Sequence, residues 1–528
     1  MRYVRPIHVC WFIILTGIVL RLVRYLYNPS LWSDESVMAE DIIMRSFPDL
    51  FQPSPDWSSK HPVGFLMLVK LAVVTFGNSE YALRIVPLLA GIASLLLFCK
   101  VAQNHIRSEV IPIALGLFAI MDPLVFQSSN IKPYSGDISI ALIILLGVHY
   151  LQSTNLRTWH IIFFGFVGAA MIWFSNTSVF VFSGTGLSLT MLYLKRKEWD
   201  RLWKTIFTFS IIAASFIVYY FTYVQNLIES TGFSVDQIVQ FEKAFIPFPP
   251  RTLSDIRLII ESFFDIFKFP LGFTLYGLAA FCFLIGCISI FRRNRDNFIL
   301  ILSPILITLF ASFLHRYAFT GRLIIFLVPF FLLFISEGAV YVSEKISVTS
   351  VAPGIIFLGL LFFYPLSWAS YHAVKPSSHE EIRPVIGYIQ DNMKKGDIVY
   401  VYYYAQYPFG YYTKFHPERF DFGDVTTVIG IAPRGWYRSW RKQDVSRYYS
   451  PNDPVLQSDS EILTAYVKDL NKLKGNRRVW ILFTSKIYKD DIPEEKFFLL
   501  HLDKIGKRLD FFGRSGISSV YLYDLSGV

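Results

Sequence analysis

Long apolar runs constrain this chain more than any other feature of its sequence. About eleven runs are long enough to cross a bilayer as a helix, which takes roughly 17 to 25 residues. With 53% hydrophobic and 17% charged residues, the chain is too apolar for a soluble protein of 528 residues. The sequence therefore predicts a polytopic α-helical membrane protein. The predicted spans lie near residues 8–27, 82–103, 109–127, 135–152, 158–174, 176–194, 203–223, 270–291, 297–313, 322–341 and 350–369.

The N-terminal apolar run has no signature of a cleaved signal peptide. The cysteines have no signature of a metal site. Residues 8–20 contain no small-residue cleavage site and are followed at once by Arg21 and Arg24, which indicates a retained signal anchor. All four cysteines lie inside apolar segments, without the close spacing of a zinc finger. We therefore expect neither a disulfide framework nor a structural zinc site.

The charges between the apolar runs predict the topology. A short apolar segment, Pro62 to Phe76, is either a span or an interfacial helix. If it lies on the membrane surface, every basic loop cluster shares the side of the N-terminus, as the positive-inside rule requires. If it crossed, the clusters KRKEWDRLWK and FRRNRD would lie outside. We therefore predict a cytoplasmic N-terminus, with residues 370–528 and the loops 28–81, 128–134, 224–269 and 314–321 on the outside.

The formal net charge of +10 does not indicate a nucleic-acid partner. The basic residues form short clusters between apolar runs, where anionic lipid headgroups are the simpler partner. We expect contacts with membrane lipids and none with nucleic acid.

A soluble domain begins where the hydropathy falls after Tyr371. Apolar residues recur at helical spacing from Ile382 to Met393, and a Gly-Asp turn then leads into the β-rich run IVYVYYY. Further strand-like runs are VWILF at 479–483 and VYLYDL at 520–525, with a predicted helix at 459–473. The C-terminal region, residues 371–528, is thus predicted to be an extracytoplasmic α/β domain that serves as an acceptor platform or lid.

Two carboxylates, Asp34 and Glu35, follow the first span in the segment LWSDESVMAEDIIMRS. One interpretation is that they cap a short amphipathic helix. The other is catalytic: a carboxylate at the membrane surface can act as a general base on an acceptor while a lipid phosphate leaves.

Other polar residues are expected at the same outer rim. The loop NIKPYSGD places Lys132, Tyr134 and Asp137 there, as a helix cap with an interfacial tyrosine or as part of a site. In HRYAFTGRLIIF, Arg316 and Arg322 are snorkelling anchors or phosphate ligands. Directly before the interfacial segment, Lys60 and His61 make headgroup contacts or belong to the site.

These motifs together resemble the GT-C superfamily, and within it the bacterial relatives of protein O-mannosyltransferases and of the aminoarabinose transferase of lipid A. The matching segments run in order from about residue 15 to residue 340. The resemblance implies a GT-C membrane module at residues 1–370, a polyprenyl-phosphate sugar donor, an acceptor that is a lipid, a glycan or a protein, and inversion at the anomeric carbon. It also implies a bacterial inner membrane. The segments are SLWSDES, KHPVGFLMLVKLAVVTFGNSEYALRIVPLLAG, NIKPYSGD, FIPFPP and RYAFTGRLIIFLVPF.

The resemblance also implies roles for single residues. Asp34 looks like the family's catalytic acid and Glu35 its neighbour, while Asp137 is similar to a second acidic residue near the site. Lys60 and Arg322 are similar to residues that meet the carrier phosphate. Some relatives bind a divalent metal through a carboxylate just before that lysine, where this chain has Ser59. This departure argues against a required metal; a divalent metal stays possible, but none is assigned.

Two other functions remain open at the level of the sequence. A transporter or flippase for a lipid-linked saccharide would carry polar, broken helices near the membrane midplane and paired repeats, whereas the ionisable groups here collect at the outer rim. A membrane anchor for the C-terminal domain would need a single span, not about eleven. The sequence therefore favours the enzyme.

Overall fold

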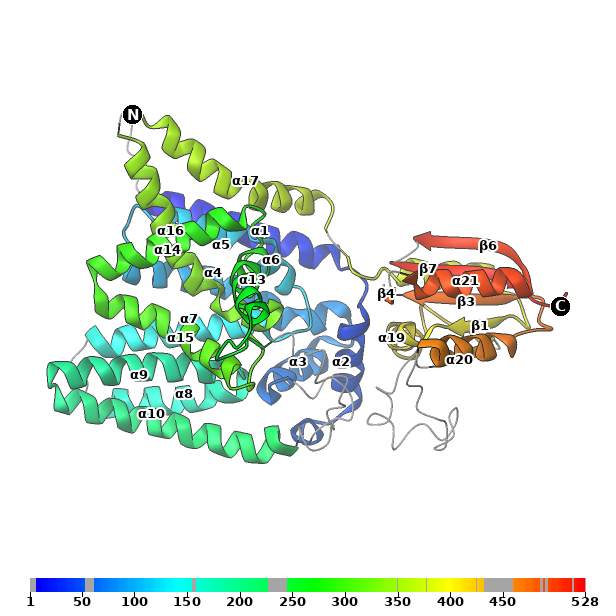
Figure 1. Ribbon diagram of the computed structural model, residues 1–528. Coiled ribbons are helices and arrows are strands. Elements are labelled where there is room, and N and C mark those ends of the chain that lie inside the picture. The colour runs from blue at the N-terminus through cyan, green and yellow to red at the C-terminus, as the bar shows by residue number, and fades with distance from the viewer. Residues whose placement is uncertain are drawn as a thin grey trace.

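The computed structural model consists of a helical bundle and a smaller α/β domain (Figure 1). It describes residues 6–52, 61–153, 158–226, 245–348, 350–376, 378–423, 425–431, 459–484, 488–489, 492–514 and 517–527. The helices of the bundle are α1 (Pro6–Tyr27), α2 (Ser33–Met44), α3 (Val63–Phe76), α4 (Glu80–His105), α5 (Ile111–Ile120), α6 (Asp122–Gln127), α7 (Tyr134–Ser153), α8 (Thr158–Phe174), α9 (Ser178–Arg196), α10 (Trp199–Tyr219), α13 (Leu253–Lys268), α14 (Tyr276–Arg293), α15 (Arg295–Phe313), α16 (Val328–Ile346) and α17 (Ala352–Val374).

Eight of the described helical segments are long and apolar enough to cross a membrane. Each predicted span overlaps at least one helix, so the prediction of a multi-helical membrane protein is confirmed. The segment from Pro62 is the apolar helix α3, which packs against α4; its place on the membrane surface stays a prediction. The eight segments are His8–Tyr27, Glu80–His105, Tyr134–Gln152, Trp199–Val224, Tyr276–Arg293, Arg295–Phe313, Gly321–Ile346 and Ala352–Val374.

The prediction of one continuous span at residues 109–127 is wrong. The segment is broken at Met121 into α5 and α6. Pro123 lacks the N–H that would donate to the carbonyl of Ala119 in an unbroken helix. The buried Arg21 of α1 fills this gap, because its Nη1 donates to the Ala119 carbonyl at 3.2 Å. The break directs α6 and the loop after it toward the end of the bundle that carries α2.

The most buried span, α16, packs closely on α14 at a pair of glycines. A Cβ added to Gly338 would lie 1.9 Å from the carbonyl oxygen of Cys282, and one added to Gly286 would lie 1.8 Å from that of Phe334. Only glycine permits backbones to approach this closely. Directly before α16, the short 3₁₀ helix η4 (Gly321–Leu327) carries Arg322. The tight packing therefore fixes the element that carries Arg322.

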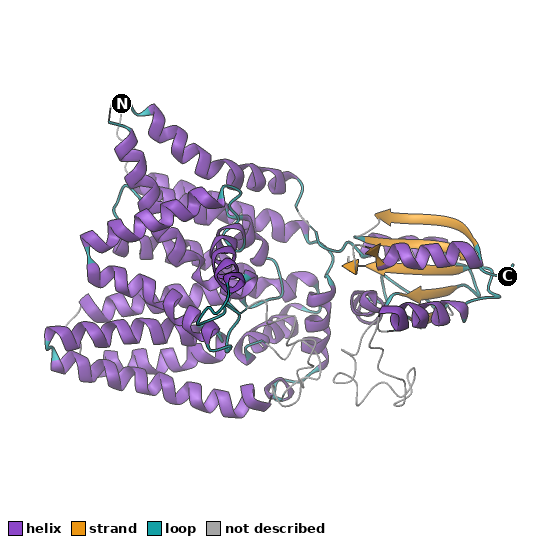
Figure 2. Ribbon diagram, in the orientation of Figure 1, coloured by secondary structure: helices purple, strands orange, loops and turns teal. Residues whose placement is uncertain are grey.

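The C-terminal domain is a mixed five-stranded sheet with helices beside it (Figure 2). The strand order is β2-β1-β3-β7-β6; β1 is parallel to β2 and β3, while β7 is antiparallel to β3 and β6. The predicted strands and helices at IVYVYYY, VWILF, VYLYDL, 382–393 and 459–473 are all present. The elements are α18 (Arg383–Asn392), β1 (Ile398–Val401), α19 (Gln406–Phe415), β2 (Thr426–Ile429), α20 (Asp459–Asn471), β3 (Val479–Thr484), α21 (Glu494–Ile505), β6 (Lys507–Arg514) and β7 (Ser518–Asp524), with a small hairpin of β4 (Tyr488–Lys489) and β5 (Ile492–Pro493).

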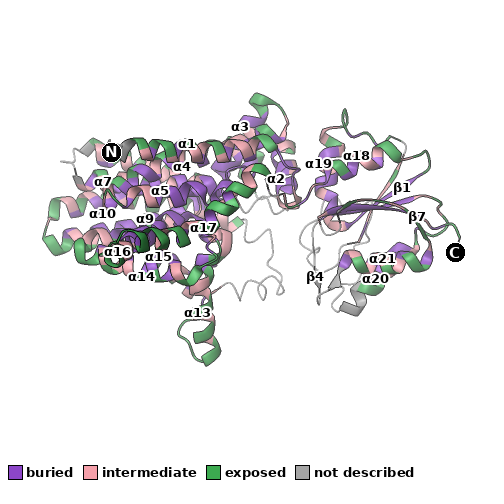
Figure 3. Ribbon diagram, turned by 90° about the horizontal axis from the view of Figure 1, so that it is seen from above, coloured by how far each residue is buried: buried purple, intermediate pink, exposed green. Residues whose placement is uncertain are grey.

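The two parts share a buried hydrophobic cluster. Leu31 and Met38 from the bundle side belong to the same cluster as Phe409 and Tyr411 of α19. In Figure 1 α19 lies beside α2, and in Figure 3 both helices show buried residues. The α/β domain is therefore packed directly onto the helix that carries Asp34.

Candidate functional site

Three chain segments meet at Asp34, at the end of the bundle next to the α/β domain. Asp34 lies in the first turn of α2, Lys132 in the loop before α7, and Arg322 in η4. Arg322 Nη1 donates to Asp34 Oδ2 at 3.0 Å, and Lys132 Nζ lies 3.9 Å from the same oxygen. A carboxylate and two cations from distant parts of the sequence thus form one cluster.

Glu35 points to a different set of partners. Arg84 of α4 binds it through two hydrogen bonds, Nε to Oε1 at 3.2 Å and Nη2 to Oε2 at 2.6 Å. The backbone N–H of Ile131 donates to the same carboxylate at 2.8 Å. Both charged side chains are fully buried, so this paired geometry is needed to offset their desolvation. Glu35 therefore ties α2 to α4 and to the residue that precedes Lys132.

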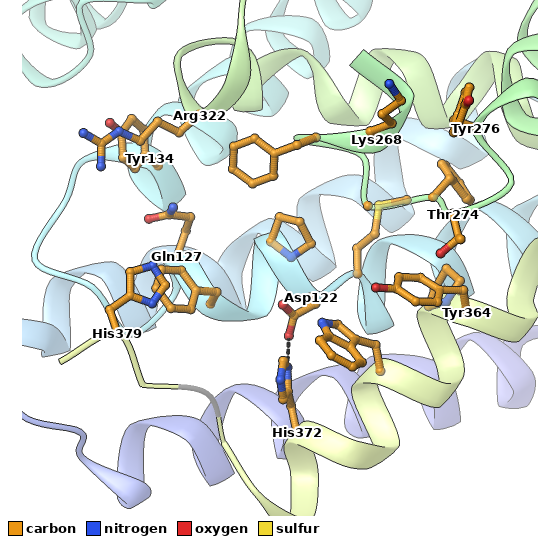
Figure 4. Close-up of a pocket in the computed structure, with 18 of the residues that line it drawn as sticks. Asp122, Gln127, Tyr134, Lys268, Thr274, Tyr276, Arg322, Tyr364, His372 and His379 are labelled. Atoms are coloured by element: carbon orange, nitrogen blue, oxygen red, sulfur yellow. Dashed lines mark hydrogen bonds and ion pairs between the residues drawn. The ribbon is translucent and has the colours of Figure 1, made fainter. Parts of the chain in front are cut away.

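A large cavity opens beside the cluster (Figure 4). Its volume is about 770 Å³, and most of its wall is aromatic or aliphatic. Arg322 and Tyr134 lie at one end, and Lys268 and Tyr276 lie at the other. Helix α17 closes one side with Tyr364, Trp368 and His372. The mostly apolar wall, with Arg322 and the neighbouring Asp34 cluster at one end, suits an amphiphile whose anionic head lies at that end.

Two further contacts shape the cavity wall. His372 Nδ1 lies 2.5 Å from Asp122 Oδ1, which joins α17 to α6 (Figure 4). The guanidinium of Arg322 lies 5.9 Å from the ring centroid of Trp32, at the distance of a cation–π contact. The Arg322 side chain is thus oriented by an aromatic ring as well as by Asp34.

Lys132 is buried, and the loss of hydration destabilises its charged form. Burial lowers its pKa from the ordinary lysine value to about 8, although Asp34 acts in the opposite direction. Its Nζ lies 3.4 Å from Nε2 of His61. The buried ammonium of Lys132 therefore lies within reach of both Asp34 and His61.

The remaining predicted site residues are placed less centrally. Tyr134 lines the cavity, whereas Asp137 is buried beside Ser175, whose hydroxyl donates to Oδ1 at 2.6 Å. Asp137 and Arg316 are not among the described residues that line the cavity, and Arg316 is exposed. Lys60 lies outside the described residues.

The described residues around Asp34 do not fit a divalent metal. In the described parts of the chain, no three His, Cys, Asp or Glu side chains come together as metal ligands would. Oδ2 of Asp34 already faces Arg322 and Lys132, and the neighbouring Glu35 is engaged by Arg84. This donor set is suited to an anion, and we assign no step to a metal.

Sequence reasoning did not identify several residues of this region. Arg84 looks like an isolated charge in a span, and nothing local predicts that it pairs with Glu35. Asp122 and His372 are 250 residues apart and are joined only by the packing of α17 on α6. The position of Arg84 inside an apolar run was the one signal in the sequence that it has an acidic partner, since buried charges are usually paired.

Comparisons with known proteins agree on the fold. The structure of ArnT from Cupriavidus metallidurans bound to undecaprenyl phosphate is similar with a TM-score of 0.52 at 11% identity, over 97% of this chain and 97% of that chain. The oligosaccharyltransferase of Archaeoglobus fulgidus in complex with Zn and sulfate gives 0.51 at 12% identity, over 98% of this chain and 73% of that one. No protein family and no curated protein matches the sequence. The chain thus shares its fold with ArnT and with the archaeal oligosaccharyltransferase along almost its whole length.

Proposed function

We propose that the protein is a membrane glycosyltransferase that transfers a sugar from a polyprenyl-phosphate carrier to an acceptor on the non-cytoplasmic face. The observation that carries this proposal is the cluster of Asp34, Arg322 and Lys132 at one end of the 770 Å³ cavity. The similarity in fold to ArnT, whose structure contains undecaprenyl phosphate, supports this class of donor.

In the proposed reaction, the cations bind the phosphate of the carrier. A guanidinium can form two parallel hydrogen bonds to phosphate oxygens and stabilise the charge that builds up as the carrier leaves. When the phosphate arrives, Arg322 and Lys132 exchange the Asp34 carboxylate for phosphate oxygens. Asp34, which paired with both cations before the phosphate bound, is then available to accept a proton.

Asp34 then acts as the general base. It accepts the proton from the acceptor hydroxyl or amine while the acceptor oxygen or nitrogen forms a bond to C1 of the sugar. The bond between C1 and the phosphate oxygen breaks in the same step, and the polyprenyl phosphate leaves with its negative charge. A single displacement of this kind inverts the anomeric carbon.

The apolar part of the cavity suits the first isoprene units of the carrier. Phe126, Phe269 and Trp368 give it an aromatic wall. We propose residues 1–370 as the catalytic module and residues 371–528 as an extracytoplasmic domain. The proposed setting is a bacterial inner membrane, with the N-terminus on the cytoplasmic side. Lys60 and His61 stay candidates for carrier contacts, and Asp137 for an acidic support of the site.

Mass spectrometry of envelope lipids and glycans tests this function and names the substrates. Cells that lack the gene should lose one hexose, pentose or amino-sugar modification and accumulate the polyprenyl-phosphate sugar, and Asp34→Asn should not restore it. If the protein were a flippase, cells with D34N would still carry the sugar on the envelope lipid or glycan. Alternatively, cells that lack the gene would accumulate the donor on the cytoplasmic face of the membrane. Envelope components that are identical with and without the gene would contradict the proposal.

A further inference from the structure

The helix that carries Asp34 is held by a carboxylate from outside the bundle. Glu380 lies in the segment between α17 and α18, and its side chain is buried. The backbone N–H of Ser33 donates to Glu380 Oε2 at 2.9 Å, and the Ser33 hydroxyl donates to the same oxygen at 2.8 Å. Ser33 is the first residue of α2, and Asp34 is the second.

Glu380 provides an N-terminal cap for α2 that the residues next to the start of this helix do not provide. Trp32, at the N-cap position of α2, offers no side-chain hydrogen bond to the free N–H groups of the first turn. A carboxylate at a helix N-terminus satisfies such a group and interacts favourably with the helix dipole. Glu380 therefore caps α2 across 347 residues of sequence.

Hydrogen bonds from the β-sheet of the α/β domain orient the Glu380 side chain. The hydroxyl of Thr484, at the end of β3, donates to Glu380 Oε2 at 3.0 Å. The hydroxyl of Ser518 in β7 donates in turn to that of Thr484 at 3.2 Å. A chain of hydrogen bonds thus runs from the central strands of the α/β domain to the first turn of α2.

The neighbouring residues hold the domain at other points. Glu381 accepts from the Ser30 hydroxyl at 2.8 Å, and Arg383 donates to Glu80 at 3.2 Å. Tyr412 donates to Glu80 at 3.1 Å. These contacts attach the domain to the loop before α2 and to α4, so docking does not depend on Glu380 alone.

We propose that Glu380 is a positioning residue of the transfer reaction, through which the α/β domain fixes the first turn of α2 and holds Asp34 against Arg322 and Lys132. This inference rests on the proposed function. In this proposal, the α/β domain has a role in the site, because it helps to position the Asp34 carboxylate.

Kinetics of three variants test the inference, with the donor and acceptor found by mass spectrometry. Glu380→Ala should lower kcat about tenfold or more and leave the KM for the donor within about twofold, since a small displacement of a catalytic group is costly. Glu380→Gln should recover most of kcat, because its amide oxygen, in the position of Oε2, can accept from both Ser33 and Thr484. Glu381→Ala, the matched control, should keep the kcat of the unchanged protein.

Two kinetic results would overturn the inference. One is E380A with an unchanged kcat, and the other is an equal fall in E380A and E381A, which would assign the loss to undocking. Thr484→Val, which removes only the hydroxyl that orients Glu380, gives a milder test if E380A folds poorly; its kcat should fall and its donor KM should not change.

Amide hydrogen exchange separates this inference from the proposed function. E380A should speed exchange at residues 33–36 at least about tenfold, while α4 and α16 keep their protection and E381A exchanges normally. Unchanged exchange at residues 33–36 would refute the cap even in an active enzyme. If the unchanged protein transfers no sugar, the proposed function fails, whatever the exchange experiment shows about the cap.

Discussion

At the scale of single residues, Asp34 and Glu35 show how adjacent carboxylates take different tasks. Asp34 is half-exposed and lies between two cations, whereas Glu35 is fully buried in a paired contact with Arg84. The sequence predicted both as site residues, and the segments of Asp34 and Arg322 as neighbours in space. It did not reveal the role of Glu35, because its partner lies 49 residues away on another helix.

The buried lysine predicts a pH dependence of donor binding. Burial lowers the pKa of Lys132 to about 8, so the ammonium loses its proton as the pH rises through that value and phosphate binding weakens. The KM for the donor should therefore increase between about pH 7 and pH 9. Lys132→Arg, whose guanidinium stays charged, should abolish the increase; an identical pH profile in K132R would contradict this assignment.

The pairing of Arg84 with Glu35 predicts a large stability effect. Arg84→Ala leaves the Glu35 carboxylate buried without its counter-charge, which costs about 3 to 5 kcal/mol. The midpoint of thermal unfolding should fall by several degrees in purified protein. Arg257→Ala is a suitable control, because Arg257 forms an exposed pair with Glu261 on α13 and should change stability little. Equal midpoints for R84A and R257A would show that the buried pair has no structural importance.

At the scale of elements, hydropathy predicted where helices occur but not where they break. Pro123 is visible in the sequence, yet the broken span depends on the hydrogen bond from Arg21 to Ala119, which is a tertiary contact. The soluble helices and strands were predictable from their periodicity. Their docking on α2 was not, because it depends on polar pairs such as Ser33 with Glu380.

The contact between α14 and α16 predicts sensitivity to a single methyl group. Gly286→Ala would place a Cβ against the carbonyl of Phe334, so the helices must separate and shift η4 with Arg322. We expect lower thermal stability and reduced transfer. Gly359→Ala in α17, where an added Cβ meets nothing within 4 Å, should be neutral or slightly stabilising. A G286A protein as stable and active as G359A would contradict this packing.

At the scale of the whole molecule, the bundle and the α/β domain depend on each other. Leu31, Met38 and Leu66 are buried in the hydrophobic cluster that includes α19. Removal of residues 376–528 should expose this surface and leave a protein that inserts but aggregates after extraction. Size-exclusion chromatography in detergent would show it, and a monodisperse truncated protein with full transfer activity would refute the dependence.

The most direct test of the proposed function is transfer of a labelled sugar by the purified protein in lipid vesicles. The unchanged protein should move label from a polyprenyl-phosphate sugar to the acceptor and release polyprenyl phosphate. Asp34→Asn should remain folded but show no transfer, while Glu40→Gln, which alters an α2 carboxylate paired with Lys414, should keep its activity. Full transfer by D34N would exclude Asp34 as the base, and an absence of transfer by the unchanged protein from every polyprenyl-phosphate sugar would contradict the enzyme assignment.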